Sequence, residues 1–174
     1  MIQKIIIAGF GGQGVMVMGE LIAYAAMYDG KNVTCIPSYG PEMRGGTANC
    51  SVVVSDEPIA SPVITTPDIL IAMNEPSLKK FEDSVLSGGM IFYNSSLIDS
   101  EEKRGDVSYI AADCITIAAE LHSERIANMV MLGAVIRKTG IISPGAAAKA
   151  LEKKFTGDKA KLIQINKKAL SSCV

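Results

Sequence analysis

The sequence predicts a three-layer α/β sandwich with a mainly parallel sheet and a helical C-terminal portion. Strand-like and helix-like segments alternate along the chain, which is typical of that class. A glycine-rich turn joins the first apolar run to a helical pattern, and helical periodicity prevails from Ile115 onward. A length of 174 residues suits one domain, so we expect a single domain over residues 1–174.

The first strand and helix follow directly from the pattern of apolar residues. We expect a strand at residues 3–9, because "QKIIIAG" is a short β-branched run of the kind that is buried in a parallel sheet. Apolar residues then recur at three- and four-residue spacings from Val15 to Ala26, which predicts a helix packed along one side. This helix should end near Gly30, which can adopt the left-handed conformation.

Five further strands are expected, at residues 32–40, 47–56, 68–74, 90–96 and 106–112. A helix is expected over residues 76–86, and Ser143 with Pro144 forms a good N-cap and first-turn pair for another helix that continues to Phe155. Gly133 lies inside an apolar helical stretch, at a cost of about 1 kcal/mol relative to alanine. We therefore expect another backbone to approach it closely.

Composition excludes several classes of function. Hydrophobic residues make up 48% of the chain and charged residues 20%, so we expect part of its apolar surface to face a protein partner. The net charge of -1 provides no basic field for a nucleic acid. No apolar run approaches the ~20 residues of a membrane span, and the N-terminal residues do not resemble a signal peptide. We expect a cytoplasmic protein with neither a nucleic-acid nor a membrane partner.

The sequence gives little support for metal or histidine chemistry. The cysteines are widely scattered and form no CxxC pair, which predicts buried free thiols rather than a zinc or iron–sulfur site: Cys35, Cys50, Cys114 and Cys173. The single histidine, His122, lies in "AAELHSERIA", a context more typical of a helix surface or end than of catalysis. We expect neither a catalytic residue nor a metal site in this chain.

The glycine turn is the first candidate site. Gly9, Gly11 and Gly14 have the spacing G-x-G-x-x-G between an expected strand and an expected helix, where free N–H groups and the helix dipole favour an anion. No carboxylate ends the second strand to hold a ribose, and no Walker lysine follows the glycines, which disfavours NAD and nucleotide triphosphates. The alternative is that the glycines only permit a tight turn and close helix packing.

A second candidate is the loop that begins after the second strand, within "PSYGPEMRGGTANCS". Loops at the carboxyl ends of strands bind ligands in open α/β sheets, and this loop should lie beside the glycine turn if the sheet is parallel. Arg44, flanked by Gly45, could present its guanidinium to a carboxylate or phosphate. The alternative is a structural ion pair between Arg44 and Glu42 or a partner's acid.

The two candidate sites also carry a family resemblance. "AGFGGQGVMVMGELIA" and "PSYGPEMRGGTANCSVVVSDEPIASP" closely resemble the gamma subunit, or fused gamma domain, of the 2-oxoacid:ferredoxin oxidoreductases. That family includes enzymes for pyruvate, 2-oxoglutarate, 2-oxoisovalerate and indolepyruvate. The resemblance continues through "PDILIAMNEPSLKKF", "NMVMLGAV" and "ISPGAAAKALEKKF", so it covers nearly the whole chain.

This resemblance implies a multi-subunit enzyme that oxidatively decarboxylates a 2-oxoacid to an acyl-CoA and carbon dioxide and passes the electrons to ferredoxin. Alpha and beta subunits would carry thiamine diphosphate with magnesium, and a ferredoxin-like delta subunit would carry the iron–sulfur clusters. The gamma part would be a Rossmann-like domain that lies against this core, has a suggested role in binding coenzyme A and is inactive alone.

The same resemblance implies that two groups of residues face the active-site region and meet coenzyme A or the substrate carboxylate. They are Gly11, Gly12 and Gly14 in the turn, and Tyr39, Glu42, Arg44, Gly45 and Gly46 in the loop. Two other functions stay open: a stand-alone dinucleotide-binding oxidoreductase, and a scaffold subunit whose glycine turn binds nothing. The sequence alone does not select the 2-oxoacid, the stoichiometry or the role of Asn128.

Overall fold

A six-stranded sheet forms the middle of the structure. The computed structural model describes residues 1–40, 46–99 and 104–172, and its strands are β1 (Ile2–Phe10), β2 (Asn32–Tyr39), β3 (Thr47–Ser55), β4 (Ile69–Ala72), β5 (Met90–Asn94) and β6 (Ser108–Ala112). All six strands expected from the sequence are present. Their order in the sheet is β2-β3-β1-β4-β5-β6, and β1, β4, β5 and β6 pair in parallel.

One strand departs from the parallel arrangement. β3 lies between β2 and β1 and pairs antiparallel with both, so β2 again points in the direction of β1. The sheet is therefore mainly parallel, as predicted. Its first two strands after α1, however, form a hairpin rather than a crossover unit.

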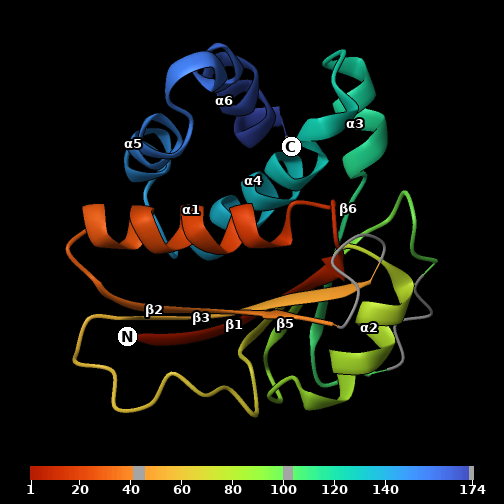
Figure 1. Ribbon diagram of the computed structural model, residues 1–174. Helices are drawn as coiled ribbons and strands as arrows, with labels where there is room; N and C mark the ends of the chain where they lie inside the picture. Colours follow the sequence, from red (N-terminus) through yellow and green to blue (C-terminus); the bar gives the residue numbers. More distant parts are fainter. Residues whose placement is uncertain (41–45, 100–103, 173–174) are drawn as a thin grey trace.

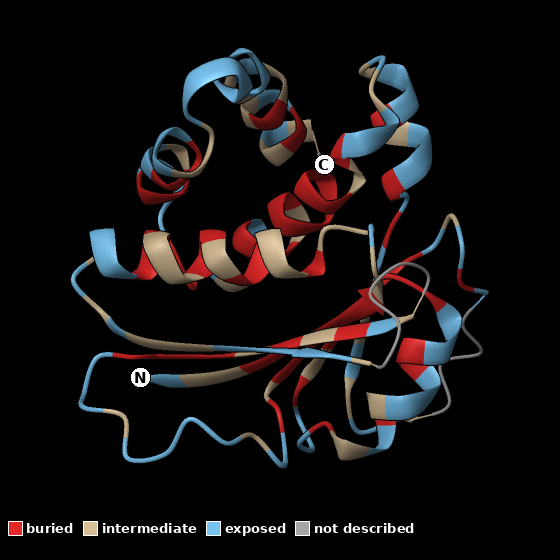
Figure 2. Ribbon diagram, in the orientation of Figure 1, coloured by how far each residue is buried: buried red, intermediate tan, exposed pale blue. Residues whose placement is uncertain are grey.

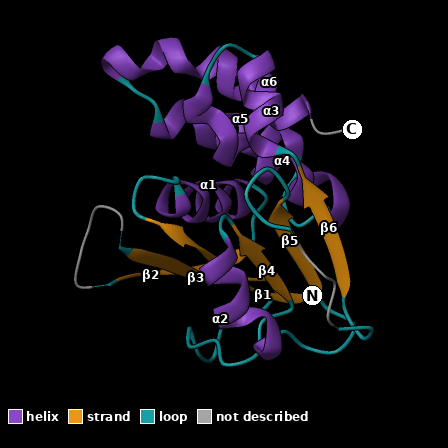
Figure 3. Cartoon of the chain, turned by 90° about the vertical axis from the view of Figure 1, so that its right-hand side faces the viewer, coloured by secondary structure: helices purple, strands orange, loops and turns teal. Residues whose placement is uncertain are grey.

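Helices cover the two faces of the sheet unequally (Figures 1 and 3). The described helices are α1 (Val15–Tyr28), α2 (Glu75–Phe81), α3 (Cys114–Glu120), α4 (Ala127–Thr139), α5 (Pro144–Lys154) and α6 (Ile163–Ser172). α1 and α4 pack on one face, with α3, α5 and α6 beyond them, whereas α2 lies on the other face. The expected helix over residues 76–86 is shorter than predicted, because a 3-10 turn, Glu82–Ser84, follows Phe81.

Two apolar clusters lie on opposite faces of the sheet, and buried residues line both (Figure 2). The larger cluster joins the sheet to the helical layers through side chains such as Phe92, Ile22 and Met129, each at most 1% exposed. The smaller one packs Leu70 and Ile91 against the segment that contains α2. Burial of both strand faces explains the continuous β-branched runs in the sequence.

Gly133 confirms the expected close approach of two backbones. It lies in α4, and a Cβ atom placed there would be 2.9 Å from the carbonyl carbon of Leu170 in α6. Only a residue without a side chain therefore allows α6 to pack this closely on α4. Within the described residues, no helix has both the length and the apolar character that crossing a membrane requires.

The connections of β1 and β4 define where a ligand would fit. From β1 the chain passes through α1 to β2, which lies on one side of β1 within the sheet, while β4 and β5 lie on the other side of β1. Strand order thus reverses between β1 and β4, and the carboxyl ends of these parallel strands leave a crevice there. The glycine turn begins at this point, directly after Phe10.

Candidate functional site

The glycine turn has the backbone shape that its sequence predicts. Gly12 and Gly14 have φ angles of 103° and 75°, in a region that favours glycine. Gly14 is the N-cap of α1, without a side-chain cap and without an acidic residue in the first helical turn. The N–H groups at the start of α1 and the positive end of its dipole are therefore not neutralised by an acidic side chain of that turn.

The two candidate loops meet, as the sequence analysis expected. The N–H of Gly11 donates a hydrogen bond of 2.9 Å to the carbonyl oxygen of Gly46, which joins the glycine turn to the end of the hairpin loop. This N–H is thus already paired, so Gly11 connects the loops, and an anion would meet Gly12 and Gly14 instead.

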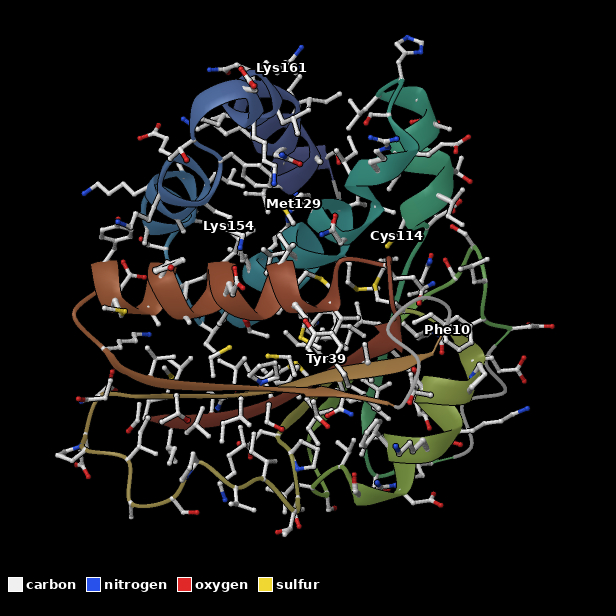
Figure 4. All side chains as sticks on the ribbon, in the orientation of Figure 1. Phe10, Tyr39, Cys114, Met129, Lys154 and Lys161 are labelled. Carbon is white, nitrogen blue, oxygen red and sulfur yellow. The ribbon has the colours of Figure 1, made fainter. Side chains whose placement is uncertain are left out.

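Of the remaining loop residues, some belong to the described part of the chain and some do not. Tyr39 is 51% exposed at the end of β2, and Figure 4 labels it together with Phe10, the last residue of β1. Gly40 donates to the carbonyl oxygen of Thr47 at 2.8 Å, which closes the base of the hairpin loop. The predicted residues Glu42, Arg44 and Gly45 lie outside the described residues.

A glutamine that sequence reasoning missed holds the turn in place. The Gln13 Oε1 atom accepts hydrogen bonds from the N–H of Phe10 at 2.7 Å and from the Asn74 side-chain amide at 2.8 Å. Its Nε2 donates to the carbonyl oxygen of Met73 at 3.2 Å. Asn74 Oδ1 in turn accepts from the N–H of Ser77 at 2.9 Å and caps α2. Gln13 thus links the turns that follow β1 and β4, on either side of the crevice.

A pocket of about 300 Å³ opens beside this turn. It lies at the carboxyl ends of β1, β4 and β5, and its lining includes the turn residues together with Met73, Asn94, Arg125 and Asn128. Two of these, Arg125 and Asn128, come from the segment around the start of α4. The lining also contains the exposed carboxylate of Glu124, but its arginine, its buried amide and the helix N-terminus can bind phosphate or carboxylate groups.

The structure shows the role of Asn128 in the fold. Its side chain is 8% exposed, and Nδ2 lies 3.4 Å from the carbonyl oxygen of Gly14, within hydrogen-bonding range. A Cβ atom at residue 14 would lie 2.6 Å from the Asn128 Cγ atom, so the glycine also makes room for this side chain. Asn128 therefore ties α4 to the start of α1 and presents an amide to the pocket.

Asn94, a lining residue of the pocket, is hydrogen-bonded to the start of α3. Asn94 ends β5, and its Oδ1 atom accepts from the N–H of Cys114 at 3.3 Å. The hydroxyl of Ser96 and the side chain of Thr116 hold the pKa of Asp113, the N-cap of α3, below its ordinary value. Within residues 1–40, 46–99 and 104–172, no cluster of three His, Cys, Asp or Glu side chains could hold a metal ion.

Comparison with known proteins decides the family. The model for pyruvate ferredoxin/flavodoxin oxidoreductase matches residues 4–173. The chain belongs to this family. A curated relative, the ketoisovalerate oxidoreductase subunit VorA of Methanothermobacter marburgensis, is 41% identical over 171 residues. That match covers 97% of this chain but 35% of VorA, so the chain spans about a third of the length of this relative.

Solved structures of the family share the fold. The gamma subunit of a keto/oxoacid ferredoxin oxidoreductase from Geobacter sulfurreducens superimposes with a TM-score of 0.82 at 32% identity, and the match covers 97% of this chain and 94% of that one. A 2-oxoglutarate:ferredoxin oxidoreductase from Magnetococcus marinus, with 2-oxoglutarate, coenzyme A and succinyl-CoA bound, gives a TM-score of 0.89 at 26% identity. That second match covers 97% of this chain and 30% of the other.

Proposed function

We propose that this chain is the gamma component of a multi-subunit 2-oxoacid:ferredoxin oxidoreductase and helps to bind coenzyme A. The enzyme would convert a 2-oxoacid, coenzyme A and oxidised ferredoxin into an acyl-CoA, carbon dioxide and reduced ferredoxin. The observation that carries the proposal is the Gly11–Gly46 hydrogen bond, because it joins the two candidate loops next to a pocket at the crevice of the sheet.

The residues present fit an anionic ligand with a long polar arm. The start of α1, with Gly12 and Gly14, suits a phosphate, and Arg125 supplies positive charge at the pocket wall. Arg44, which lies outside the described residues, is proposed from the sequence as a second basic residue for the ligand. Asn128 offers an amide that can exchange hydrogen bonds with a neutral polar group. When bound, coenzyme A supplies the thiol that accepts the acyl group, while the chain's own residues bind and orient it.

The remaining chemistry belongs to partner subunits in this proposal. Alpha and beta subunits would hold thiamine diphosphate and magnesium, and a ferredoxin-like delta subunit would hold the iron–sulfur clusters. This chain would then form one gamma-type domain over residues 1–174 that contributes binding residues and assembly surface. The substrate is left open, because related proteins are named for ketoisovalerate and for 2-oxoglutarate.

Steady-state kinetics of the assembled complex test the proposal. We expect Arg44→Ala and Arg125→Ala each to raise the KM for coenzyme A by about 10-fold or more with little change in kcat, because a charge-assisted hydrogen bond contributes about 1.5–3 kcal/mol. Arg137→Ala is the matched control: this exposed arginine lies in α4 and donates to the carbonyl oxygen of Ser171, away from the pocket.

Two outcomes separate the proposal from its alternatives. If both arginine variants assemble normally and keep the wild-type KM for coenzyme A, neither arginine helps to bind it, and the scaffold alternative is favoured. If the chain purifies from its native extract alone and binds a nicotinamide cofactor, it is a stand-alone dinucleotide-binding oxidoreductase. Recovery with thiamine diphosphate and iron–sulfur subunits, active on one 2-oxoacid, would support the proposal and name the substrate.

A further inference from the structure

Two cysteines meet on neighbouring strands of the β2–β3 hairpin. Cys35 lies opposite Val52, and Cys50 lies opposite Pro37, so the cysteines are diagonal neighbours whose side chains project from the same face of the sheet. Their Sγ atoms are 3.3 Å apart. A disulfide bond needs ~2.05 Å, so the two sulfurs would have to approach by about 1.3 Å to become bonded.

The helix above the hairpin leaves room for this pair. α1 places Gly19 over the two thiols, and a Cβ atom there would lie 2.5 Å from the Cys50 sulfur and 3.5 Å from the Cys35 sulfur. Any larger residue would press on the Cys50 sulfur. Cys50 is 1% exposed, whereas Cys35 is only half-buried, so a small reagent reaches Cys35 first.

The local environment assigns different roles to the two thiols. The hydrogen bond between the two thiols lowers the pKa of Cys35. The same hydrogen bond and burial raise the pKa of Cys50. The carboxylate of Glu20, which is paired with Lys154, opposes formation of either thiolate. Because the thiolate is the nucleophile, Cys35 is the attacking residue and Cys50 the resolving one.

We propose that Cys35 and Cys50 form a reversible, oxidant-dependent disulfide that cross-links the β2–β3 hairpin. The oxidant is a small disulfide, R–S–S–R. The Cys35 thiolate attacks one of its sulfurs, the S–S bond breaks, and one RS⁻ leaves and takes up a proton. Cys50 then loses its proton and attacks the Cys35 sulfur, which releases the second RS⁻. The cysteines together lose two electrons and two protons, and R–S–S–R becomes two RSH.

The disulfide should be easily reduced, and it should restrict the motion of the hairpin that contains the candidate loop. Diagonal neighbours are farther apart than directly opposed residues, which strains the link, and strained disulfides are reduced more readily. The segment between the two cysteines, residues 36–49, contains Tyr39 and Gly46. Oxidation would therefore restrain the hairpin whose end is joined to the glycine turn.

Thiol chemistry on the full-length chain tests this inference independently of the proposed function. The background variant is Cys173→Ser, which removes the thiol near the C-terminus and so prevents coupling between chains through it. Folded, reduced protein is exposed to glutathione disulfide, digested without reduction and mapped by mass spectrometry. We expect loss of the two thiols, a cross-linked Cys35–Cys50 peptide, slower hydrogen exchange in the hairpin, and full reversal by dithiothreitol.

Single variants identify the attacking residue. In Cys50→Ser, we expect Cys35 to hold a stable mixed disulfide with glutathione, because nothing resolves it. In Cys35→Ser, the buried Cys50 should stay reduced as long as the chain is folded, and so should the buried Cys114 in every variant. The proposal is overturned if the background variant yields no cross-linked peptide, or if Cys35 and Cys50 react only after denaturation.

Discussion

Replacing Gln13 tests whether one side chain holds the candidate site together. Gln13→Ala removes three hydrogen bonds, two accepted from Phe10 N–H and the Asn74 amide and one donated to the Met73 carbonyl. A typical intramolecular hydrogen bond contributes about 1 kcal/mol net. Because Gln13 is only half-buried, water can replace part of this, so we expect a loss of about 2–3 kcal/mol in the free energy of unfolding.

Equilibrium urea unfolding of the isolated chain measures this loss. With an m-value of about 2 kcal/mol per molar urea, the midpoint should fall by about 1–1.5 M while m stays constant. Heat unfolding gives a second estimate, since about 2–3 kcal/mol corresponds to roughly 4–12 °C in a protein of this size.

Gln13→Glu is the matched control, because it keeps the oxygen that accepts from Phe10 and Asn74, while a carboxylate oxygen replaces the donor to the Met73 carbonyl. We expect it to destabilise the chain less than Gln13→Ala. In the assembled complex, however, its negative charge under the glycine turn should raise the KM for coenzyme A more than Gln13→Ala does. The reasoning fails if Gln13→Ala stays within about 0.5 kcal/mol of wild type, or if the two variants lose equal stability and equal affinity.

Three further substitutions test packing and pH dependence, one of them as a control. Gly133→Ala should destabilise the chain by about 1–3 kcal/mol, because its Cβ would press on the backbone of Leu170, whereas Gly145→Ala, with open space around it, should be neutral or stabilising by up to about 1 kcal/mol. Equal urea midpoints for these two variants would contradict the close approach. Asp113→Asn should lower the free energy of unfolding at neutral pH but not in acid. The hydrogen bond from Ser96 lowers the folded-state pKa of Asp113, so its carboxylate stabilises the fold above the unfolded-state pKa. This stabilisation is lost as the pH falls through the folded-state pKa. A stability difference from wild type that is constant between neutral and acidic pH would refute this.

The strands were predictable because each is a compact apolar run, but such a run does not give the direction of β3. The signal was available: β2 ends at Tyr39 and β3 starts at Thr47, which is too short a connection for a parallel crossover. Pro37 and the glycines of the loop marked a break in the chain without indicating a hairpin. The shortened α2 has a similar cause, since periodicity alone does not distinguish a helix from a following 3-10 turn.

The site was predictable only where its residues are local in sequence. Gly14 belongs to a spacing motif, and Gly12 stands out as a further glycine beside it. The two loops were expected to be neighbours, but they meet through the antiparallel pairing of β1 with β3, which was not predicted. Asn128 was noted as a polar residue on an apolar helix, but its partner Gly14 is 114 positions away. Gln13 occupies an unspecified position of the motif, and its role depends on Asn74, 61 positions away. Such contacts are created by the fold, and no local pattern identifies them.

The position of β3 between β1 and β2 accounts for the missing carboxylate that would bind the ribose in a dinucleotide site. In the usual arrangement the second strand lies beside the first, and a carboxylate at its end reaches the ribose of a nucleotide bound at the glycine turn. Here β3 separates β2 from β1, which moves the end of β2 two strand spacings, about 10 Å, from the turn. The space beside Gly11 is filled instead by Gly46, at the end of the hairpin loop. A carboxylate near Tyr39 would be too far from the turn to hold a ribose there, so the inserted strand β3 disfavours a nicotinamide dinucleotide bound at the turn in the usual way.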